Sequence, residues 1–401
     1  MKIDRRSLLK LLPASFLQFR AAQQTIPFIN GRKRARELGI RIGLMQPGKW
    51  NAITDVPGVK VGHCTLIRGS GPLRVGEGPV RTGVTVVLPQ SNIFDEYVAC
   101  GFHILNGNGE VTGLDAIKSF GVLGSPICLT NTASIGMVYD AMLPLFPKDQ
   151  EMKLLPVVGE TWDEFLNDVV GRHVHAEHVY AALKSAKSGP VAEGCVGGGT
   201  GMICYEFKGG IGTASRALPG PLEKYTVGAI VQANHGSREY LRIDGVPVGE
   251  EISNMKPEPD EASYLNSILI VLATDAPLLD DQLYRLARRG GMGLAKTGSI
   301  SSNSSGDFIL AFSTANRIRR EQFWKGKRYS FGSIEQFDIN PIFQAASEAT
   351  EEAIINALFM ATDMEGRDHH KVYALPIDRV LKIMDRHRRL FLNEEKKVAS
   401  I

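Results

Sequence analysis

The chain has few of the features that mark several common classes of protein. Its five cysteines are odd in number and show no Cys-x-x-Cys spacing, so we expect small buried thiols rather than a metal or redox role. No apolar run approaches the roughly 20 residues that cross a bilayer, and there are no internal repeats. The cysteines are Cys64, Cys100, Cys128, Cys195 and Cys204.

A strong net charge is also missing. The chain carries +3, but its first 24 residues hold five basic residues and one acidic residue, which leaves 41 basic against 42 acidic residues, or −1, in the rest. Without a basic surface the sequence argues against nucleic acid or an anionic membrane as a partner. With 401 residues, 43% of them apolar, the chain is long enough for one large α/β domain or two smaller ones.

The N-terminus resembles an export signal. Arg5 and Arg6 precede two leucines and a lysine, then an uncharged stretch at 11–19 and small residues at 21–22. This pattern is typical of a twin-arginine signal, and the alternative is a basic amphipathic helix that stays attached. We expect residues 1–24 to be removed and the protein to be periplasmic or secreted, or cytoplasmic if the signal interpretation is wrong. Export in the folded state suits unpaired thiols.

Short β-rich runs bounded by glycine and proline alternate with helical patterns. An N-cap at Asp275 is expected to start one helix, and residues 246–265, which include three prolines, are expected to form an exposed loop that leads to Asn266. Strands flanked by helices fit sheets covered by helices, and the periodicity alone also allows a doubly wound sheet. The expected strands lie at 59–67, 83–89, 127–131 and 227–233, and the expected helices at 162–187, 278–296, 342–360 and 377–393.

The peptide bond between Asn266 and Ser267 stands at the start of the apolar run 268–273. If this bond is cut, Ser267 carries a free α-amine with a pKa of about 7.7–8.0 beside its own hydroxyl. Nucleophile and base then share one residue, which is the N-terminal variant of nucleophilic catalysis. Ser305 and Asp307 precede a second apolar run and are candidates to reach the same sheet edge. The alternative is that these residues simply begin buried strands.

A series of motifs runs from residue 51 to residue 278. They are NAITDVPGV at 51–59, VGH at 61–63, RTGVT at 81–85, LNGNGE at 105–110, LTNT at 129–132, GGGTGM at 197–202, VQANHG at 231–236 and ATDAPL at 273–278. In sequence and order they resemble the L-aminopeptidase/D-esterase (DmpA-type) and β-peptidyl aminopeptidase family, and the likeness runs from about residue 34 to about residue 361.

This resemblance implies a four-layer αββα sandwich, the DmpA/ornithine-acetyltransferase-like fold. It implies a single catalytic domain, 25–401, that cuts itself into chains 25–266 and 267–401. Ser267 would be the nucleophile, and Ser305 and Asp307 would be the family's second serine and acidic residue. No metal or other cofactor is implied. Relatives form assemblies of processed pairs, so a homo-oligomer is expected.

The resemblance also assigns the substrate site. Asn234 matches the asparagine that lines the oxyanion site, and Glu160 matches the glutamate that holds the substrate's free amine, with Asn131 expected beside it. Trp162 stands where relatives carry tyrosine, so substrate shape or an oxyanion contact would differ. Asp307 stands where β-peptide-cleaving relatives more often carry glutamate, which favours the L-aminopeptidase branch. The alternatives are a turn asparagine for Asn234 and a helix first-turn acid for Glu160.

Three other patterns lack the spacing of a functional site. The glycine-rich run 194–201 has neither G-x-G-x-x-G nor a lysine-serine ending, so close backbone packing or a substrate-lining turn is expected. The histidines and the glutamate at 173–178 match no metalloprotease motif, and we expect a solvated patch on a helix. The DHH sequence at 368–370 has no supporting context.

The sequence therefore predicts an exported, self-processing serine aminopeptidase. Its substrates would be short peptides, amides or esters with a free amine, and the reaction would pass through an acyl-enzyme on Ser267. β-Peptidyl specificity is one alternative. An acyltransferase of related fold, which passes the acyl group to an amine instead of water, is a second, and a binding sandwich that never cuts is a third.

Overall fold

The computed structural model describes residues 31–147, 154–259, 266–326 and 328–391. Its contacts form two units, 1–32 and 33–401, and the second carries the fold. The predicted export signal at 1–24 lies outside the described residues. No helix in the described ranges is long and apolar enough to span a bilayer.

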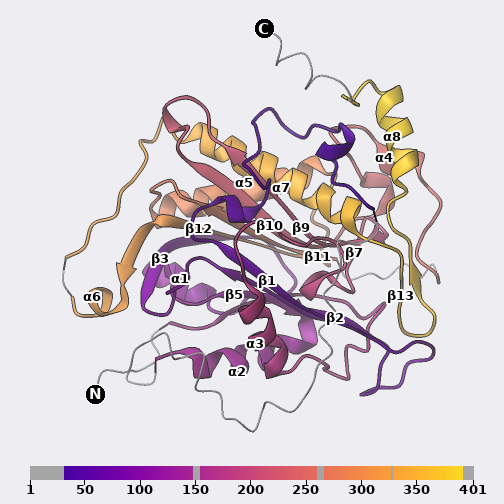
Figure 1. The fold of residues 1–401 in the computed structure, drawn as a ribbon, viewed down its shortest axis with the longest axis horizontal. Coiled ribbons are helices and arrows are strands. Elements are labelled where there is room, and N and C mark those ends of the chain that lie inside the picture. Colours follow the sequence, from indigo (N-terminus) through magenta and orange to yellow (C-terminus); the bar gives the residue numbers. More distant parts are fainter. Residues whose placement is uncertain (1–30, 148–153, 260–265, 327, 392–401) are drawn as a thin grey trace. The chain divides into compact units, whose positions relative to one another are not determined.

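Two sheets form the centre of the larger unit (Figure 1). One has four strands in the order β1 (Lys60–Arg68), β2 (Val80–Leu88), β5 (Ile127–Asn131) and β6 (Val157–Thr161). The other has six, in the order β4 (Val122–Leu123), β3 (Glu96–Gly107), β12 (Gly306–Arg319), β11 (Ser267–Thr274), β10 (Thr226–Asn234) and β9 (Gly210–Ala217). Strand β11 pairs parallel with β12 and antiparallel with β10.

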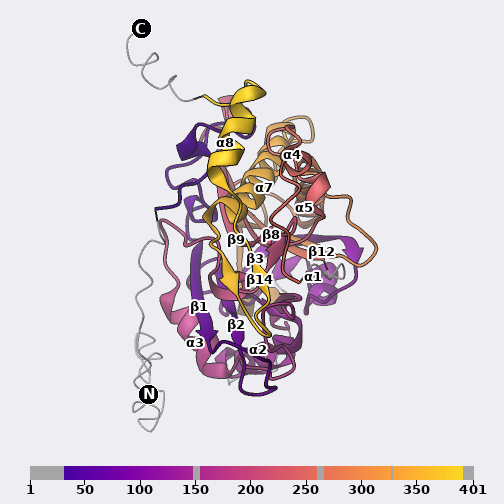
Figure 2. The same ribbon diagram turned by 90° about the vertical axis from the view of Figure 1, so that its right-hand side faces the viewer.

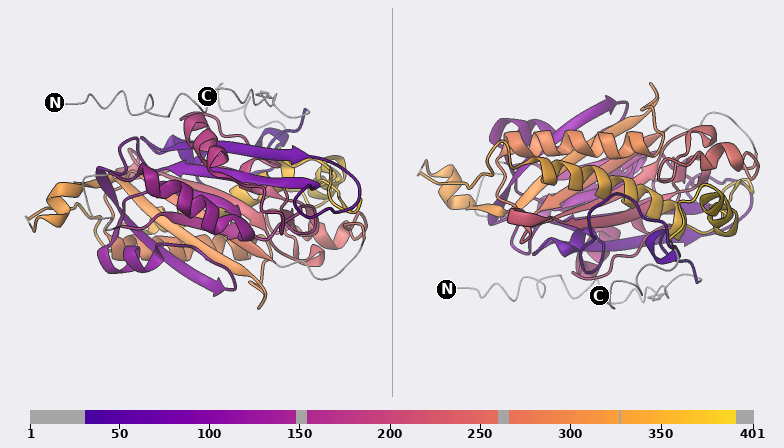
Figure 3. Two further views of the ribbon diagram at one scale, coloured as in Figure 1. Left: turned by 90° about the horizontal axis from the view of Figure 1, so that it is seen from below. Right: turned by 90° about the horizontal axis from the view of Figure 1, so that it is seen from above.

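Helices cover the outer face of each sheet. Helices α5 (Asp280–Lys296) and α7 (Asn340–Met360) pack on the six-stranded sheet, and α2 (Ile135–Met142) and α3 (Ala176–Ser185) pack on the four-stranded sheet (Figures 2 and 3). The two sheets face each other, and Gln232 of β10 donates from its side chain to the Thr130 carbonyl and the Thr161 hydroxyl, both at 2.8 Å. The predicted four-layer αββα sandwich is therefore confirmed.

The remaining elements are short. The small sheets are β7 (Ile203–Cys204) with β8 (Phe207–Lys208), and β13 (Met364–Glu365) with β14 (Lys371–Val372). The other α-helices are α1 (Leu114–Phe120), α4 (Val248–Glu251), α6 (Arg320–Trp324) and α8 (Ile377–Arg386).

The central strands are apolar on both faces because each face packs on another layer. Every residue of β11 is buried, since one face meets the outer helices and the other meets the second sheet. This is the composition expected of strands that are covered on both sides. Small residues let α7 approach closely. Gly212 of β9 has no room for a Cβ against the backbone of Ala353 and Ala357.

Most predicted elements are confirmed with small shifts at their ends. The four expected strands appear as β1, β2, β5 and β10, and the expected helices at 278–296 and 342–360 appear as α5 and α7. The helix predicted at 377–393 ends early, since α8 stops at Arg386. The expected buried thiols are confirmed, because the cysteines are all free and only Cys64 is partly exposed.

The helix predicted at 162–187 is wrong in its first half, because only Ala176–Ser185 is helical. Side chains in the preceding segment bond to backbone groups and so compete with a helix. Asp168 accepts from the Gly76 and Gly171 N–H groups at 2.7 and 3.0 Å. The expected solvated histidine patch is wrong at His173, which is buried and lies 2.8 Å from Asp168 Oδ2.

Two further local predictions are wrong. The N-cap of α5 is Leu279 and not Asp275. The Asp275 carboxylate instead accepts from the Thr226 N–H at 2.7 Å. The exposed loop predicted at 246–265 is wrong in its first part, which contains the short helix α4 and buries Val246, Val248 and Ile252. Residues 253–259 are non-helical and, apart from Pro257, exposed or partly exposed, as predicted. Apolar side chains that reach the core hold the first part of the segment down, and residues 260–265 lie outside the described ranges.

Candidate active site

Strand register brings the predicted catalytic residues together around Ser267. Ser267 is the first residue of β11, where it pairs with Asn234 at the end of β10 on one side and with Gly306 at the start of β12 on the other. Asp307 is the next residue of β12. The candidate nucleophile therefore lies between the candidate oxyanion residue and the candidate acid, and its side chain is buried.

The Asn266 carbonyl is in contact with groups suited to chemistry at this bond. The Ser267 hydroxyl donates to the Asn266 oxygen at 2.6 Å, and the Gly306 N–H donates to the same oxygen at 3.2 Å. The Gly306 N–H is also 3.2 Å from Ser267 Oγ. Attack on this carbonyl would place negative charge on an oxygen that a backbone donor already contacts.

Ser305 and Asp307 form a buried pair beside this bond. The Ser305 hydroxyl donates to Asp307 Oδ1 at 2.5 Å, while Asp307 Oδ2 has no hydrogen-bond partner within the described residues. Burial raises the pKa of Asp307, and the hydroxyls of Ser305 and Ser301 and the Ile268 N–H oppose that rise. An unpaired carboxylate oxygen next to the strand of Ser267 is a suitable site for a cation.

The raised pKa of Asp307 gives a stability prediction for the uncut Ser267→Ala chain. Because the folded-state pKa lies above the unfolded one, the free energy of unfolding falls as pH rises from the ordinary value of 3.8 through the raised value. Asp307→Asn, which does not ionise, should therefore raise Tm, by an amount that grows with pH over this window. Thermal scans of both chains from about pH 4 to pH 8 check this. A Tm difference that is the same at every pH would contradict it.

Asn234 is held in one orientation by backbone groups on both sides. Its Oδ1 accepts from the Ile203 N–H at 2.8 Å, and its Nδ2 donates to the Trp162 carbonyl at 2.9 Å. Trp162 therefore serves the site through its backbone, whereas its indole N–H donates to Glu164 at 3.0 Å. The contact between Asn234 and residue 162 does not depend on whether that residue is tryptophan or tyrosine.

Glu160 lies near the end of β6, so its interpretation as a helix first-turn acid is wrong. Its Oε1 accepts from the Glu110 N–H at 3.0 Å, and its Oε2 accepts from the Thr132 hydroxyl. Burial raises the pKa of Glu160, the two hydrogen bonds oppose the rise, and the neighbouring Glu110 carboxylate adds to it. A further cation, such as a substrate ammonium, would favour the ionised form.

Asn131 is not in the position expected for it beside Glu160. Its neighbour Thr130 aligns with Glu160 in the β5–β6 pair, so alternation places Asn131 on the other face. The Asn131 amide donates to Thr82 Oγ1 at 2.6 Å and also contacts Asp163, whose pKa burial raises to about 7. Thr132 makes the contact with Glu160 instead.

Comparison with known proteins decides the family. The model of peptidase family S58 matches residues 51–372. The chain belongs to this family. It is similar to the β-peptidyl aminopeptidase BapA of Sphingosinicella xenopeptidilytica, with 46% identity over 88% of this chain and 90% of the relative. This S58 peptidase is accordingly a hydrolase that acts as an aminopeptidase.

Solved structures agree with this assignment. The S58 peptidase is similar to a β-aminopeptidase from Burkholderia sp., with 47% identity, a TM-score of 0.81 and coverage of 88% of this chain and 99% of the other. It is also similar to the L-aminopeptidase D-Ala-esterase/amidase of Ochrobactrum anthropi, with 40% identity, a TM-score of 0.82 and coverage of 89% and 99%. That enzyme is described as a serine aminopeptidase and a variant of the Ntn hydrolase fold.

The sequence analysis missed two asparagines that hold the Ser305 loop. Asn106 Nδ2 donates to the carbonyls of Ser302 and Asn303 at 3.0 and 3.3 Å and also to that of Ser305. Asn108 Nδ2 donates to the Ser304 carbonyl at 2.8 Å. A β-bulge in β3 lies at the same place, and bulges are common beside active sites. The alternating Asn-Gly-Asn-Gly at 106–109 was the available signal.

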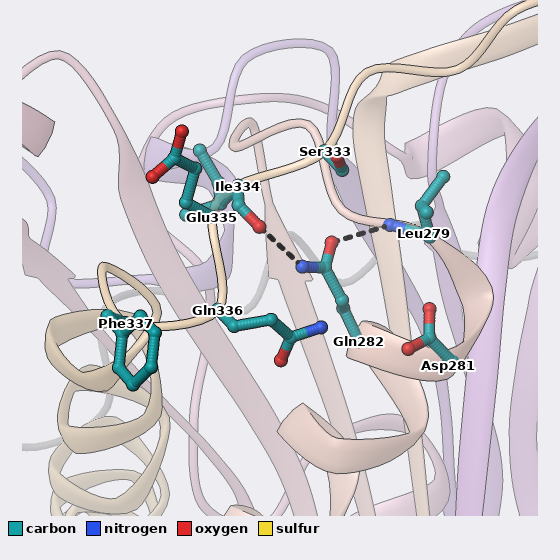
Figure 4. A pocket seen from close by; sticks show the side chains of 8 residues that line it. All are labelled: Leu279, Asp281, Gln282, Ser333, Ile334, Glu335, Gln336 and Phe337. Atoms are coloured by element: carbon teal, nitrogen blue, oxygen red, sulfur yellow. Dashed lines mark hydrogen bonds between the residues drawn. The ribbon is translucent and has the colours of Figure 1, made fainter.

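The buried Cys204–His235 pair of the S58 peptidase is not suited to act as a nucleophile. Cys204 Sγ is 3.9 Å from His235 Nδ1, but burial raises the thiol pKa to about 12 and lowers that of His235 to about 3, so both stay neutral. The described ranges contain no cluster of three metal-ligating side chains. An open cavity of about 410 Å³ at the start of α5 is lined by Gln282 and Phe337 among others, and by none of the candidate residues (Figure 4).

Proposed function

We propose that this S58 aminopeptidase cuts its own chain between Asn266 and Ser267 and then uses Ser267 as an N-terminal nucleophile. The observation that supports this most directly is the position of Ser267 between Asn234 and the Gly306–Asp307 end of β12. The substrates are short peptides, amides or esters with a free amine, and the products are the released N-terminal residue and the shortened remainder.

Self-cleavage begins with the Ser267 hydroxyl, which lies against the Asn266 carbonyl. Its oxygen attacks the carbonyl carbon and the Gly306 N–H stabilises the oxyanion. The C–N bond then breaks as the Ser267 nitrogen takes the proton that the hydroxyl has lost. The resulting ester joins Asn266 to Ser267 Oγ. Water hydrolyses this ester, which leaves a carboxylate on Asn266 and a free amine on Ser267.

Turnover uses the new amine as the base. The amine takes the hydroxyl proton while Ser267 Oγ attacks the carbonyl of the substrate's first residue, and Asn234 Nδ2 donates to the oxyanion. Asp307 Oδ2, which has no partner within the described residues, stabilises the ammonium. The ammonium then gives its proton to the leaving amine. Water attacks the acyl ester by the same route and regenerates Ser267.

Recognition of the free amine is assigned to Glu160. A buried carboxylate in a water-poor site makes a strong charge-assisted hydrogen bond to an ammonium. Among the relatives, two have names that refer to β-peptides or a β-aminopeptidase, and one to L-residues. We infer that the reaction extends to β-amino acyl substrates. The names of the relatives support β-peptidyl specificity as well as they support the L-aminopeptidase branch.

Replacing Glu160 with glutamine should weaken substrate binding. A neutral amide loses the charge on a hydrogen bond worth about 1.5–3 kcal/mol, so KM for an amino acyl p-nitroanilide should rise about 10-fold to 100-fold, with a smaller change in kcat. Steady-state kinetics check this, with Glu164→Gln as a control carboxylate two residues past Trp162. An unchanged KM would remove Glu160 from amine recognition.

Export and assembly remain proposals. The twin-arginine pattern in residues 1–24 supports a periplasmic or secreted enzyme, and the resemblance to assembling relatives supports a homo-oligomer of processed chain pairs. N-terminal sequencing of the exported protein and its molecular mass in solution test these two points.

The central test is the denaturing intact mass of the purified protein. Two chains, the second beginning at Ser267, are expected. One uncut chain that still releases N-terminal residues would contradict the mechanism, because Ser267 would then have no amine to use.

A further inference from the structure

The last two residues of β3 and the turn after it, together named loop 106–110, connect the two halves of the site. At one end Asn106 and Asn108 donate their side-chain amides to backbone carbonyls of residues 302–305, the loop that carries Ser305. The Asn108 N–H donates to the Ser305 carbonyl at 3.3 Å. This end is therefore tied to the strand that pairs with Ser267.

The other end of the loop is tied to Glu160. The Glu110 N–H donates to Glu160 Oε1 at 3.0 Å. Gly109 lies between the two halves: a Cβ on it would be 2.8 Å from Glu160 Oε1, 3.2 Å from Phe308 Cε2 and 3.5 Å from Gly306 Cα. Because Gly109 has no Cβ, the carboxylate can lie close to the Ser267–Gly306 strand pair.

We propose that loop 106–110 sets the span between the Glu160 carboxylate and the Ser267 nucleophile and so selects between α- and β-amino acyl substrates. This inference rests on the proposed function, in which Glu160 holds the amine and Ser267 attacks the carbonyl. A β-amino acid has one more methylene between its amine and its carbonyl carbon than an α-amino acid has. A span fixed by hydrogen bonds at both ends does not adjust freely to both lengths.

Gly109→Ala is the direct test, because it adds a methyl group between the carboxylate and the strand pair. Gly109 lies outside the left-handed backbone region, so alanine is conformationally allowed. The methyl should push Glu160 away and lengthen the span. The ratio of kcat/KM for β-alanyl p-nitroanilide to that for L-alanyl p-nitroanilide should rise about tenfold, the low end of the effect of one methylene on specificity.

Gly107→Ala is the matched control in the same loop. Its Cβ would meet only Ile104 Cγ2, at 3.7 Å, which is an ordinary contact. The ratio should stay within about twofold of wild type, which is under 0.5 kcal/mol. Glu160→Asp should shift the ratio in the same direction as Gly109→Ala, because it withdraws the carboxylate by one methylene while the Asn106 and Asn108 contacts at the other end of the loop are kept.

The outcomes separate the inference from the proposed function. A ratio in Gly109→Ala equal to that in Gly107→Ala overturns the inference and leaves the aminopeptidase mechanism in place. A wild-type protein inactive on both substrates overturns the proposed function. If Gly109→Ala yields no folded, processed enzyme, Asn106→Ala is the deciding variant. Because it releases the Ser305 loop, it should bring the kcat/KM values for the β-alanyl and L-alanyl substrates closer together. An unchanged ratio overturns the inference. Asn316→Ala, which removes a similar carbonyl-binding amide from β12, is its control.

Discussion

Ser267→Ala is expected to produce a folded chain of uncut length without aminopeptidase activity. The hydroxyl that contacts the Asn266 carbonyl is lost, so the ester cannot form and the amine is never released. The mutant keeps the buried start of β11, since alanine fits a position where Ser267 is almost fully enclosed. Loss of the nucleophile should lower turnover below detection, and intact mass with a p-nitroanilide assay measures both effects.

An exposed serine in the same half of the chain is the control for this prediction. Ser333→Ala should be cut and active, because Ser333 lies at the cavity near α5 and away from the candidate residues. Cleavage at 266–267 in the Ser267→Ala chain would show that another group attacks the bond. Aminopeptidase activity in the uncut mutant would show that turnover does not depend on the N-terminal amine.

Asn234→Ala is expected to reduce kcat about 10²-fold to 10³-fold, the usual cost of one oxyanion donor, or about 2.7–4 kcal/mol. Its amide is oriented by the Ile203 N–H and the Trp162 carbonyl, so no reorganisation is needed when charge develops on the substrate. Self-cleavage should slow less than turnover, because the Gly306 N–H already contacts the Asn266 oxygen.

Two rates measured on the same variant test this difference. The rate of chain cleavage after synthesis and the kcat of the processed enzyme should fall by different factors in Asn234→Ala. Asn316→Ala, a buried asparagine on β12 away from the site, should change neither rate by more than a few fold. A rise in KM with unchanged kcat would mean that Asn234 binds substrate and does not stabilise the transition state.

The limits of the apolar runs in the sequence predict where the strands end and which residues lie at those ends. Ser267, Asp307 and Asn234 each lie where an apolar run begins or stops. The structure brings all three to the same end of the neighbouring strands β10, β11 and β12. The motifs carry the family resemblance because they surround these ends. Glu160 was identified by its motif alone, since no strand was predicted at 157–161, where β6 lies.

The helix misassigned at 162–175 has a local physical cause. Between 162 and 175 the apolar spacing suits a helix, but Asp163, Asn167 and Asp168 bond locally to side chains and backbone and stabilise an irregular segment. Asn131 was grouped with Glu160 because the two motifs belong to one site. Strand alternation, which depends on the register of β5 against β6, gives the contact to Thr132 instead.

The sequence by itself predicted the sandwich through the family resemblance, and it marked the candidate nucleophile, oxyanion residue and acidic residue, because motifs and local apolar runs identify these positions. Only the tertiary structure decided which groups contact each other: the Gly306 N–H at the Asn266 carbonyl, and the Asn106–Glu110 loop between Glu160 and the Ser305 loop. It also decided that Asp307 Oδ2 has no hydrogen-bond partner among the described residues. These contacts join segments up to about 200 residues apart. They follow from strand order and register, which local sequence patterns do not contain.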